Sequence, residues 1–434
     1  MRWLPTLFAA EAIPSAMITF VALLMFLQLG VGWEWSTLLC SLLTLPWVMK
    51  SFVRAKLRQV GHFNWQLRFL ELGMAFLLVA LSFCFTDRFA AQWLIFACLF
   101  VLCLLCAAHE LVARMYYERM LRPRWQRYYN SWKMFIAQST VVLTYGVMVV
   151  GVGLLEVFYH NRRTAISLSW SMAVYILAGI YLLLVIYNLF VLRPPRVTDH
   201  TSSSLLSAVR AEIHVIDRIA HKPHWLGVVL CLAFLLLPQA LLFHTRVLLF
   251  ISSRTQGGLA VSLPWIGLIQ GTVGVMAFSV GLAVGHWLLF RCPSSVLASS
   301  SRSLLSLMVL LLGLSPLVYW ALASTLPSNL LVLCLAAFFA QLFFGFGLNA
   351  TMPFVRYISG ERYRNTINYL YIPLISFVML LPMAASGWLV SVFGFCHFFL
   401  LNAFTVLLAY VAAYVGLRLV SSSSQTIHSP HNEK

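Results

Sequence analysis

The sequence predicts an all-α membrane protein with twelve transmembrane helices arranged as two six-helix bundles. Of its 434 residues, 61% are hydrophobic and 9% are charged, and the mean hydropathy is +0.89. A soluble domain carries about a quarter charged residues, and it could not keep this much apolar surface away from water. A lipid bilayer is the solvent that fits this composition.

Apolar runs of about twenty residues, the length needed to cross the hydrocarbon core, recur along the whole chain. The predicted spans cover residues 7–29, 35–53, 67–86, 91–111, 132–157 and 167–192 in the first half, and 224–248, 262–290, 303–323, 328–355, 367–393 and 396–420 in the second. We expect the first run to be a retained helix and not a signal peptide, because it is long and many spans follow it.

Polar stretches divide the predicted chain into four segments. These are an N-terminal bundle at 1–192, a cytoplasmic linker at 193–222, a C-terminal bundle at 223–420 and a disordered tail at 421–434. Apolar residues in the linker recur every three to four positions from Leu206 to Ile219. This spacing predicts an amphipathic helix lying at the membrane interface.

Positive side chains are distributed unevenly between the loops. With both chain ends in the cytoplasm, 24 of the 29 Lys and Arg residues fall on the cytoplasmic side and 5 on the other. Short cytoplasmic loops of membrane proteins are enriched in positive charge, so the bias predicts cytoplasmic termini and an even number of spans. The net charge of +17 has the same origin. Since no separate basic domain exists, we expect no nucleic-acid partner.

Motifs for catalysis and cofactor binding are missing from the sequence. It contains no Walker P-loop, no H-E-x-x-H and no G-x-S-x-G. Nearly all nine cysteines lie inside apolar runs, and Cys103-Leu-Leu-Cys106 has no second pair or nearby His to complete a metal site. We therefore expect no catalytic residue, no metal and no cofactor.

Charged side chains inside the spans of the first half are the main functional candidates, because charge in the hydrocarbon core is expensive. Glu11 lies shortly before Pro14, where a helix can break. It could bind a coupling proton or a cationic group, or it could pair with a nearby Lys or Arg. Lys50 ends the second span and can snorkel to the interface. Glu71 lies three residues after Arg68 on one helix face, a spacing typical of a structural pair.

Other polar residues are assigned weaker roles. His109, Glu110 and Arg114 end the fourth span beside a basic loop, which indicates electrostatic anchoring of a helix end. The second half is nearly free of charge within its spans, and a polar cavity there would need only a few well-placed groups. The candidates for such a cavity are Gln239, His244, Gln270, Gln341 and Asn349.

Glycines indicate where helices pack closely. Two spans are rich in them: the fifth contains Gly146, Gly151 and Gly153, and the eighth contains Gly267, Gly271, Gly274, Gly281 and Gly285.

Several segments resemble the AmpG-type muropeptide permeases, a branch of the major facilitator superfamily related to acetyl-CoA transporters. In the first half these are Leu4-Pro-Thr-Leu-Phe-Ala-Ala-Glu11-Ala-Ile-Pro14, Leu45-Pro-Trp-Val-Met-Lys50 and Ala107-Ala-His-Glu110. In the second half they are Gly257-Gly-Leu, Gly271-Thr-Val-Gly-Val275, Phe344-Gly-Phe-Gly347 and Ser359-Gly-Glu-Arg-Tyr-Arg364. The segments cover most of the chain in the order expected for the family.

The chain also departs from the family pattern. After Lys50 it reads Ser-Phe-Val-Arg-Ala-Lys-Leu-Arg58, with a base where the family has a loop acid, and Arg114 stands where members often have Asp. The seventh span, around Leu236 to His244, lacks charges that relatives place there.

The resemblance implies a proton-coupled symporter of the bacterial inner membrane that works by alternating access and imports anhydro-muropeptides or a related anionic solute. In this interpretation Glu11 contacts the proton or the substrate, and Lys50 and Arg54 complement an anionic substrate at the cytoplasmic mouth.

Two alternatives to this function stay open. The missing charges of the seventh span favour a protein that has lost transport and acts as a scaffold or receptor. A membrane-embedded enzyme would need clustered acidic or His residues in a large loop, and the loops here are short and basic.

Overall fold

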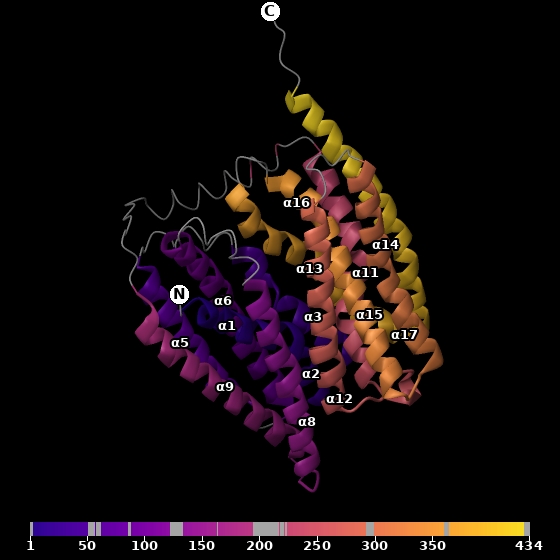
Figure 1. The fold of residues 1–434 in the computed structure, drawn as a ribbon. Coiled ribbons are helices and arrows are strands. Elements are labelled where there is room, and N and C mark those ends of the chain that lie inside the picture. Colours follow the sequence, from indigo (N-terminus) through magenta and orange to yellow (C-terminus); the bar gives the residue numbers. More distant parts are fainter. Residues whose placement is uncertain are drawn as a thin grey trace, which may run out of the picture. The chain divides into compact units, whose positions relative to one another are not determined.

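The computed structural model describes residues 3–50, 57, 62–85, 88–121, 133–162, 164–193, 217, 221, 224–291, 299–359 and 364–428, and their regular structure is helical (Figure 1). Within these residues ten helical stretches are long and apolar enough to cross a membrane. The last of them, Tyr371–Val420, has 50 residues, enough for two crossings. The shorter helix Trp33–Leu42 and the helical residues 45–50 occupy the second predicted span. The predicted all-α membrane fold is confirmed.

The first half follows the predicted order of spans. Its elements are α1 (Trp3–Ala16), η1 (Met17–Val21), α2 (Ala22–Gln28), α3 (Trp33–Leu42), α5 (Phe63–Ser82), α6 (Arg88–Met120), η2 (Val142–Val147), α8 (Met148–Phe158) and α9 (Ala165–Val191). The fifth span is already helical from Lys133. At Pro14, where a break is expected, the chain stays helical and changes at Met17 to the wider π form of η1. Such a local change in hydrogen bonding is one way in which a helix accommodates an internal proline.

The second half ends in a single long helical stretch. Its elements are α11 (Trp225–Ile251), η3 (Arg254–Gln256), α12 (Leu263–Ile266), η4 (Gly267–Gly274), α13 (Val275–Arg291), α14 (Ser299–Thr325), α15 (Leu330–Leu348), η5 (Asn349–Thr351), α16 (Met352–Ser359) and α17 (Arg364–His428). Gly394, with φ 70° and ψ 163°, interrupts α17 between the eleventh and twelfth predicted spans, a conformation that glycine adopts readily. The helix also continues to His428, into the segment expected to be a disordered tail, because elongating an existing helix adds a hydrogen bond per residue.

The chain groups into two compact units that differ in one segment from the predicted halves. Unit 1 contains Met1–Glu212 and Ala260–Val275, and unit 2 contains Ile213–Leu259 and Met276–Lys434. The beginning of the eighth span therefore packs with the first half of the sequence. The amphipathic helix predicted for the linker lies outside the described residues, apart from Asp217 and His221.

Small residues account for the packing of Ala260–Val275 in unit 1. A Cβ atom added to Gly271 in η4 would lie 2.5 Å from the backbone carbonyl of Tyr145 in η2. One added to Gly153 would lie 2.3 Å from the ring of Pro264. Only glycine permits such an approach, so the expected close packing of the fifth and eighth spans is confirmed. Gly151 takes no part in it, since a Cβ there would meet open space.

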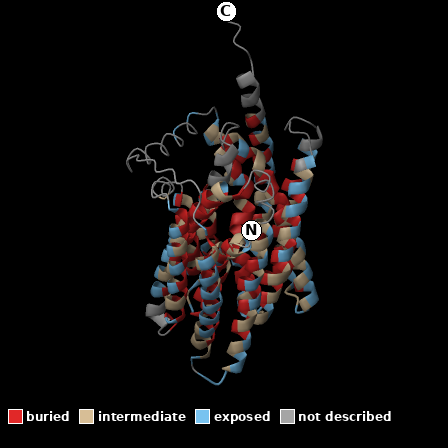
Figure 2. Cartoon of the chain, turned by 60° about the vertical axis from the view of Figure 1, so that its left-hand side comes forward, coloured by how far each residue is buried: buried red, intermediate tan, exposed pale blue. Residues whose placement is uncertain are grey.

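Each unit has its own apolar core, and large apolar side chains also cover the outside. The core of unit 1 includes Phe8, Phe63 and Tyr116, and that of unit 2 includes Leu235 and Phe354. Figure 2 shows exposed positions running along helices whose other positions are buried. Among the described residues many of these exposed positions are Phe, Leu, Val, Ile or Trp. An apolar exterior of this kind matches a lipid environment.

Candidate functional site

A chain of alternating charges runs through the interior of unit 1. Lys50 Nζ lies 2.9 Å from Glu110 Oε2, and the two side chains are 2% and 10% exposed. Lys133 Nζ lies 2.7 Å from Glu11 Oε1 and 3.9 Å from Glu110 Oε1. Lys133 thus stands between two carboxylates, and the four charges sum to zero. Burial of charge requires such pairing, because an unpaired ion in an apolar interior is strongly disfavoured.

The two ends of this charge chain differ in exposure. The Lys50–Glu110 end is almost fully buried, whereas the side chains of Lys133 and Glu11 are 25% and 13% exposed. One carboxylate oxygen of Glu11, Oε2, is buried and has no hydrogen-bond partner in the described structure. Glu11 and Lys133 therefore form the more exposed end of the charge chain.

The length of α6 explains why Glu110 takes part. This helix has 33 residues and is about 50 Å long, more than the hydrocarbon core of about 30 Å. Glu110 lies ten residues before its last residue, Met120, and is therefore interior. Our interpretation of His109 and Glu110 as anchors of a helix end is wrong for this reason. The snorkelling interpretation of Lys50 is wrong as well, because its ammonium group is buried against Glu110.

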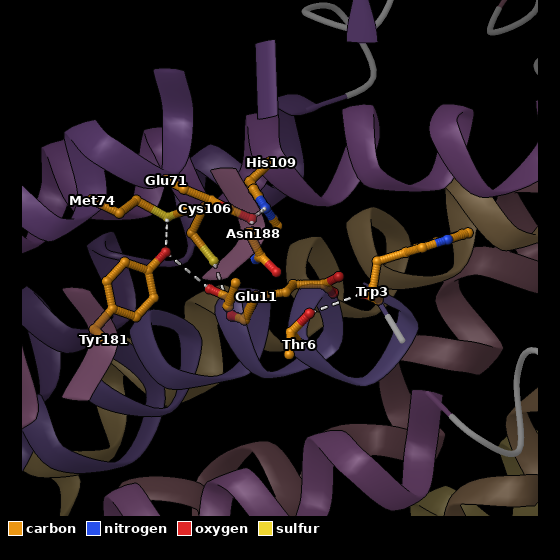
Figure 3. Close-up of polar contacts among 10 residues, drawn as sticks. Trp3, Thr6, Glu11, Glu71, Met74, Cys106, His109, Tyr181 and Asn188 are labelled. Atoms are coloured by element: carbon orange, nitrogen blue, oxygen red, sulfur yellow. Dashed lines mark hydrogen bonds and ion pairs between the residues drawn. The ribbon is translucent and has the colours of Figure 1, made fainter. Parts of the chain in front are cut away.

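A second polar cluster lies beside the charge chain (Figure 3). His109 Nε2 lies 3.3 Å from Glu71 Oε1, and Asn188 Nδ2 donates a hydrogen bond of 2.9 Å to the same oxygen. All three side chains are completely buried. Consecutive residues of an α-helix point about 100° apart, so His109 faces this cluster while Glu110 faces Lys50.

Arg68 has another role than the predicted pair with Glu71. Its guanidinium donates to the carbonyl oxygens of Leu189 and Leu192, at 2.8 Å and 2.9 Å. These are among the last carbonyls of α9, which have no partner within their own helix. Arg68 therefore caps α9, and the prediction of an Arg68–Glu71 pair is wrong.

The candidates from the second half of the sequence are all buried, and three of them form hydrogen bonds with the backbone. Gln239 Nε2 donates to the carbonyl of Leu312 at 2.7 Å, and Asn349 Nδ2 donates to three carbonyls at 3.1–3.3 Å. His244 is hydrogen-bonded to the backbone of Met383. Gln341 is buried in α15. The structure does not bring these four side chains into one polar cluster among the described residues of unit 2.

Two further predicted residues stand apart from that group. Gln270 lies in η4, within unit 1, and its buried Nε2 has no hydrogen-bond partner among the described residues. Arg54 lies outside the described residues.

Sequence reasoning missed Lys133 and Asn188 and underrated Glu110 and His109. Asn188 could have been noticed as an isolated amide within the apolar sixth span. Lys133 follows a basic loop and looks like one more cytoplasmic charge. Its position between two carboxylates depends on how three spans pack, and no local pattern indicates it.

The helices and their order define an all-α membrane protein. No family model matches the chain, and no curated protein matches it by sequence. Solved structures do match over nearly the whole chain. A bacterial homologue of the human lysosomal transporter Spinster, in an inward-facing and occupied conformation, has a TM-score of 0.70 and 12% identity, with 98% of this chain and 96% of that chain covered.

Two other matches have the same architecture. A structure that describes substrate recognition in proton-dependent oligopeptide transporters has a TM-score of 0.66 and 9% identity, with 98% of both chains covered. The xylose transporter XylE from E. coli has a TM-score of 0.63 and 10% identity, with 96% of this chain and 98% of that chain covered. At these identities the likeness shows the fold.

Proposed function

We propose that this protein is a secondary active transporter of the bacterial inner membrane that couples inward movement of an anionic solute to protons. The single observation that carries the proposal is the position of Lys133 between Glu11 and Glu110 at the more exposed end of a buried charge chain. The matching structures are transporters, and one of them concerns proton-dependent transporters.

The geometry suggests how proton and solute could favour each other. Protonation of Glu11 removes its negative charge and weakens its 2.7 Å contact with Lys133. The Lys133 ammonium is then available to an anionic group of the solute, such as a carboxylate. By linkage, an anion bound to Lys133 raises the affinity of Glu11 for a proton to the same degree. Proton and anion therefore bind together, which is the requirement for symport.

The Lys50–Glu110 pair would stay in place during this exchange. It is almost fully buried, and Glu110 already balances the charge of Lys50. Lys50 thus holds Glu110 in position beside Lys133, and we assign it a positioning role. Alternating access, in which two bundles rock about a central binding site, is the mechanism that fits the fold.

The resemblance to AmpG-type permeases makes an anhydro-muropeptide the first solute to test. These molecules carry carboxylates, the group that Lys133 would bind. The Lys and Arg bias supports a topology with both termini in the cytoplasm, so uptake would run toward that side.

Uptake of labelled anhydro-muropeptide into proteoliposomes, with and without an inward proton gradient, tests the proposal. We expect gradient-driven accumulation by the native protein and its loss in Glu11→Gln. Glu34→Gln is the matched control, because Glu34 lies in the first turn of α3, outside the charge chain, and this variant should accumulate the solute normally.

If correctly folded native protein takes up no muropeptide, this solute is excluded. If Glu11→Gln transports as the native protein does, the role of Glu11 is excluded. Absence of transport for a panel of anionic solutes would favour the scaffold or receptor.

A further inference from the structure

Three completely buried side chains from three different helices meet in unit 1, as described above and shown in Figure 3. Glu71 comes from α5, His109 from α6 and Asn188 from α9, and both neighbours contact the same carboxylate oxygen of Glu71. Two of the three side chains titrate, and the role proposed for Glu11 and Lys133 uses neither of them.

Packing alone does not explain this cluster. Glu71 Oε2, His109 Nδ1 and Asn188 Oδ1 are buried and have no hydrogen-bond partner in the described part of the chain. A structural polar cluster is stable when all of its members are satisfied, and each unsatisfied buried atom weakens it. Each such atom therefore needs an explanation, and a role in binding a proton is one.

The charge around the cluster restricts its protonation. The ionisable groups near it include Glu11 from α1, Lys50, Arg68 from α5, Cys103, Cys106, Glu110 and Arg114 from α6, Lys133, and Tyr181 from α9. Arg68 is bound to carbonyls of α9, and Lys133 and Lys50 are bound to Glu11 and Glu110. Tyr181 donates its hydroxyl to the carbonyl of Ala10. Among the described contacts, His109 is therefore the ionisable side chain that directly contacts the Glu71 carboxylate.

We infer that Glu71 and His109 form a site that binds and releases one proton, separate from Glu11. In the loaded state the proton lies on Glu71 Oε1 or on His109 Nε2, and the pair has no net charge. On release the proton passes to water, and a carboxylate remains beside a neutral imidazole. The amide of Asn188 stabilises that carboxylate through its 2.9 Å hydrogen bond.

The complete burial of the site suits a transported proton. In this conformation neither side chain has exposed surface, so the proton exchanges only when the surrounding helices move. A proton that cannot exchange in an occluded conformation does not leak across the membrane. The claim that this proton drives solute uptake rests on the proposed function. The claim that the pair binds and releases a proton does not.

Infrared difference spectroscopy of the purified full-length protein in lipid nanodiscs tests the titration without any solute. In a pH scan between about pH 5 and pH 8 the release of this one proton should appear as one of two changes: loss of the carbonyl stretch of a protonated carboxyl if the proton lies on Glu71, or loss of the imidazolium ring bands if it lies on His109. The other carboxyls and the remaining eleven histidines also contribute to the spectra, so native and variant proteins are compared: Glu71→Gln and the double variant Glu71→Gln/His109→Gln should each lack this one change and keep the rest. The double variant replaces the pair by two amides that can still hydrogen-bond, so it guards against misfolding of a single variant.

Two control variants separate this site from the other carboxylates. Glu34→Gln and Glu11→Gln should both retain the pH-dependent change of the Glu71–His109 pair. A native protein without that change over this pH range, or a double variant that still shows it, would overturn the inference.

A transport assay tests whether this proton drives uptake of the solute. In proteoliposomes the double variant should lose gradient-driven accumulation of the solute but keep exchange of labelled for unlabelled solute. A merely structural cluster would affect both equally, and that result would overturn the coupling role. If the native protein transports nothing but shows the spectroscopic change, the proton site stands and the proposed function fails.

Discussion

The two units bury polar side chains in contrasting ways. In unit 1 charged groups from different helices pair with each other, as Lys50 does with Glu110 and Lys133 with Glu11. In unit 2 buried amides and hydroxyls donate to backbone carbonyls, as Gln239 does to Leu312 and Ser315 to Ala340.

The sequence shows the origin of this contrast. Asp and Glu are absent from residues 218–360 and 362–432, so no acidic residue lies in the predicted spans of the second half. Charge pairs and titratable pairs can exchange protons or solute ions, whereas amide-to-carbonyl bonds join helices without a change of charge. The contrast therefore favours unit 1 as the place of the proposed proton chemistry, while the spans of unit 2 contain buried Arg246 but no carboxylate.

The largest effect is expected from breaking one buried charge pair of unit 1. Lys50→Met leaves the carboxylate of Glu110 next to Lys133 alone, at 3.9 Å. Removing one partner of a buried ion pair costs about 3–5 kcal/mol of stability. The thermal unfolding temperature of the detergent-solubilised protein should fall accordingly. Lys50→Met/Glu110→Gln should recover most of the loss, because it leaves no unpaired charge, and a double variant as unstable as Lys50→Met would contradict the pairing.

An intermediate effect, equal in both units, is expected at the close glycine contacts. A Cβ on Gly271 in unit 1 or on Gly281 in unit 2 would lie 2.5 Å or 2.2 Å from a backbone carbonyl. Overpacking of this kind costs about 1–3 kcal/mol, so Gly271→Ala and Gly281→Ala should both lower the unfolding temperature. Gly151→Ala is the control, since its Cβ meets open space and alanine favours the helix by about 1 kcal/mol. Equal stability of all three variants would show that the contacts are looser than described.

The smallest effect is expected from the neutral hydrogen bonds of unit 2. Gln239→Leu removes one donor to the Leu312 carbonyl. Interhelical hydrogen bonds in membranes contribute about 0.6 kcal/mol on average, so the unfolding temperature should change little. Gradient-driven uptake should also persist, in contrast to Glu11→Gln. Loss of uptake in well-folded Gln239→Leu would place substrate chemistry in unit 2 and break the comparison between the units.

The sequence predicted some of the site and missed its connections. Glu11 and Lys50 could be selected because charge within an apolar span is rare and expensive. Their partners could not, since Lys133 is far from Glu11 in the sequence and Glu110 was taken for the end of a helix. Glu71 was assigned to Arg68 on local spacing, but in the fold Arg68 reaches the end of α9 and His109 reaches Glu71.

Composition and periodicity by themselves determined that this chain is an all-α membrane protein with spans in a definite order. The reason is physical: backbone polar groups in a bilayer must be satisfied within each helix, so every long apolar run becomes a span. Only the tertiary structure decided which charges meet and that Ala260–Val275 packs in unit 1. Those outcomes depend on how side chains of distant spans fit together, and the local sequence pattern marks a glycine or a charge in a span without indicating which distant residue it contacts.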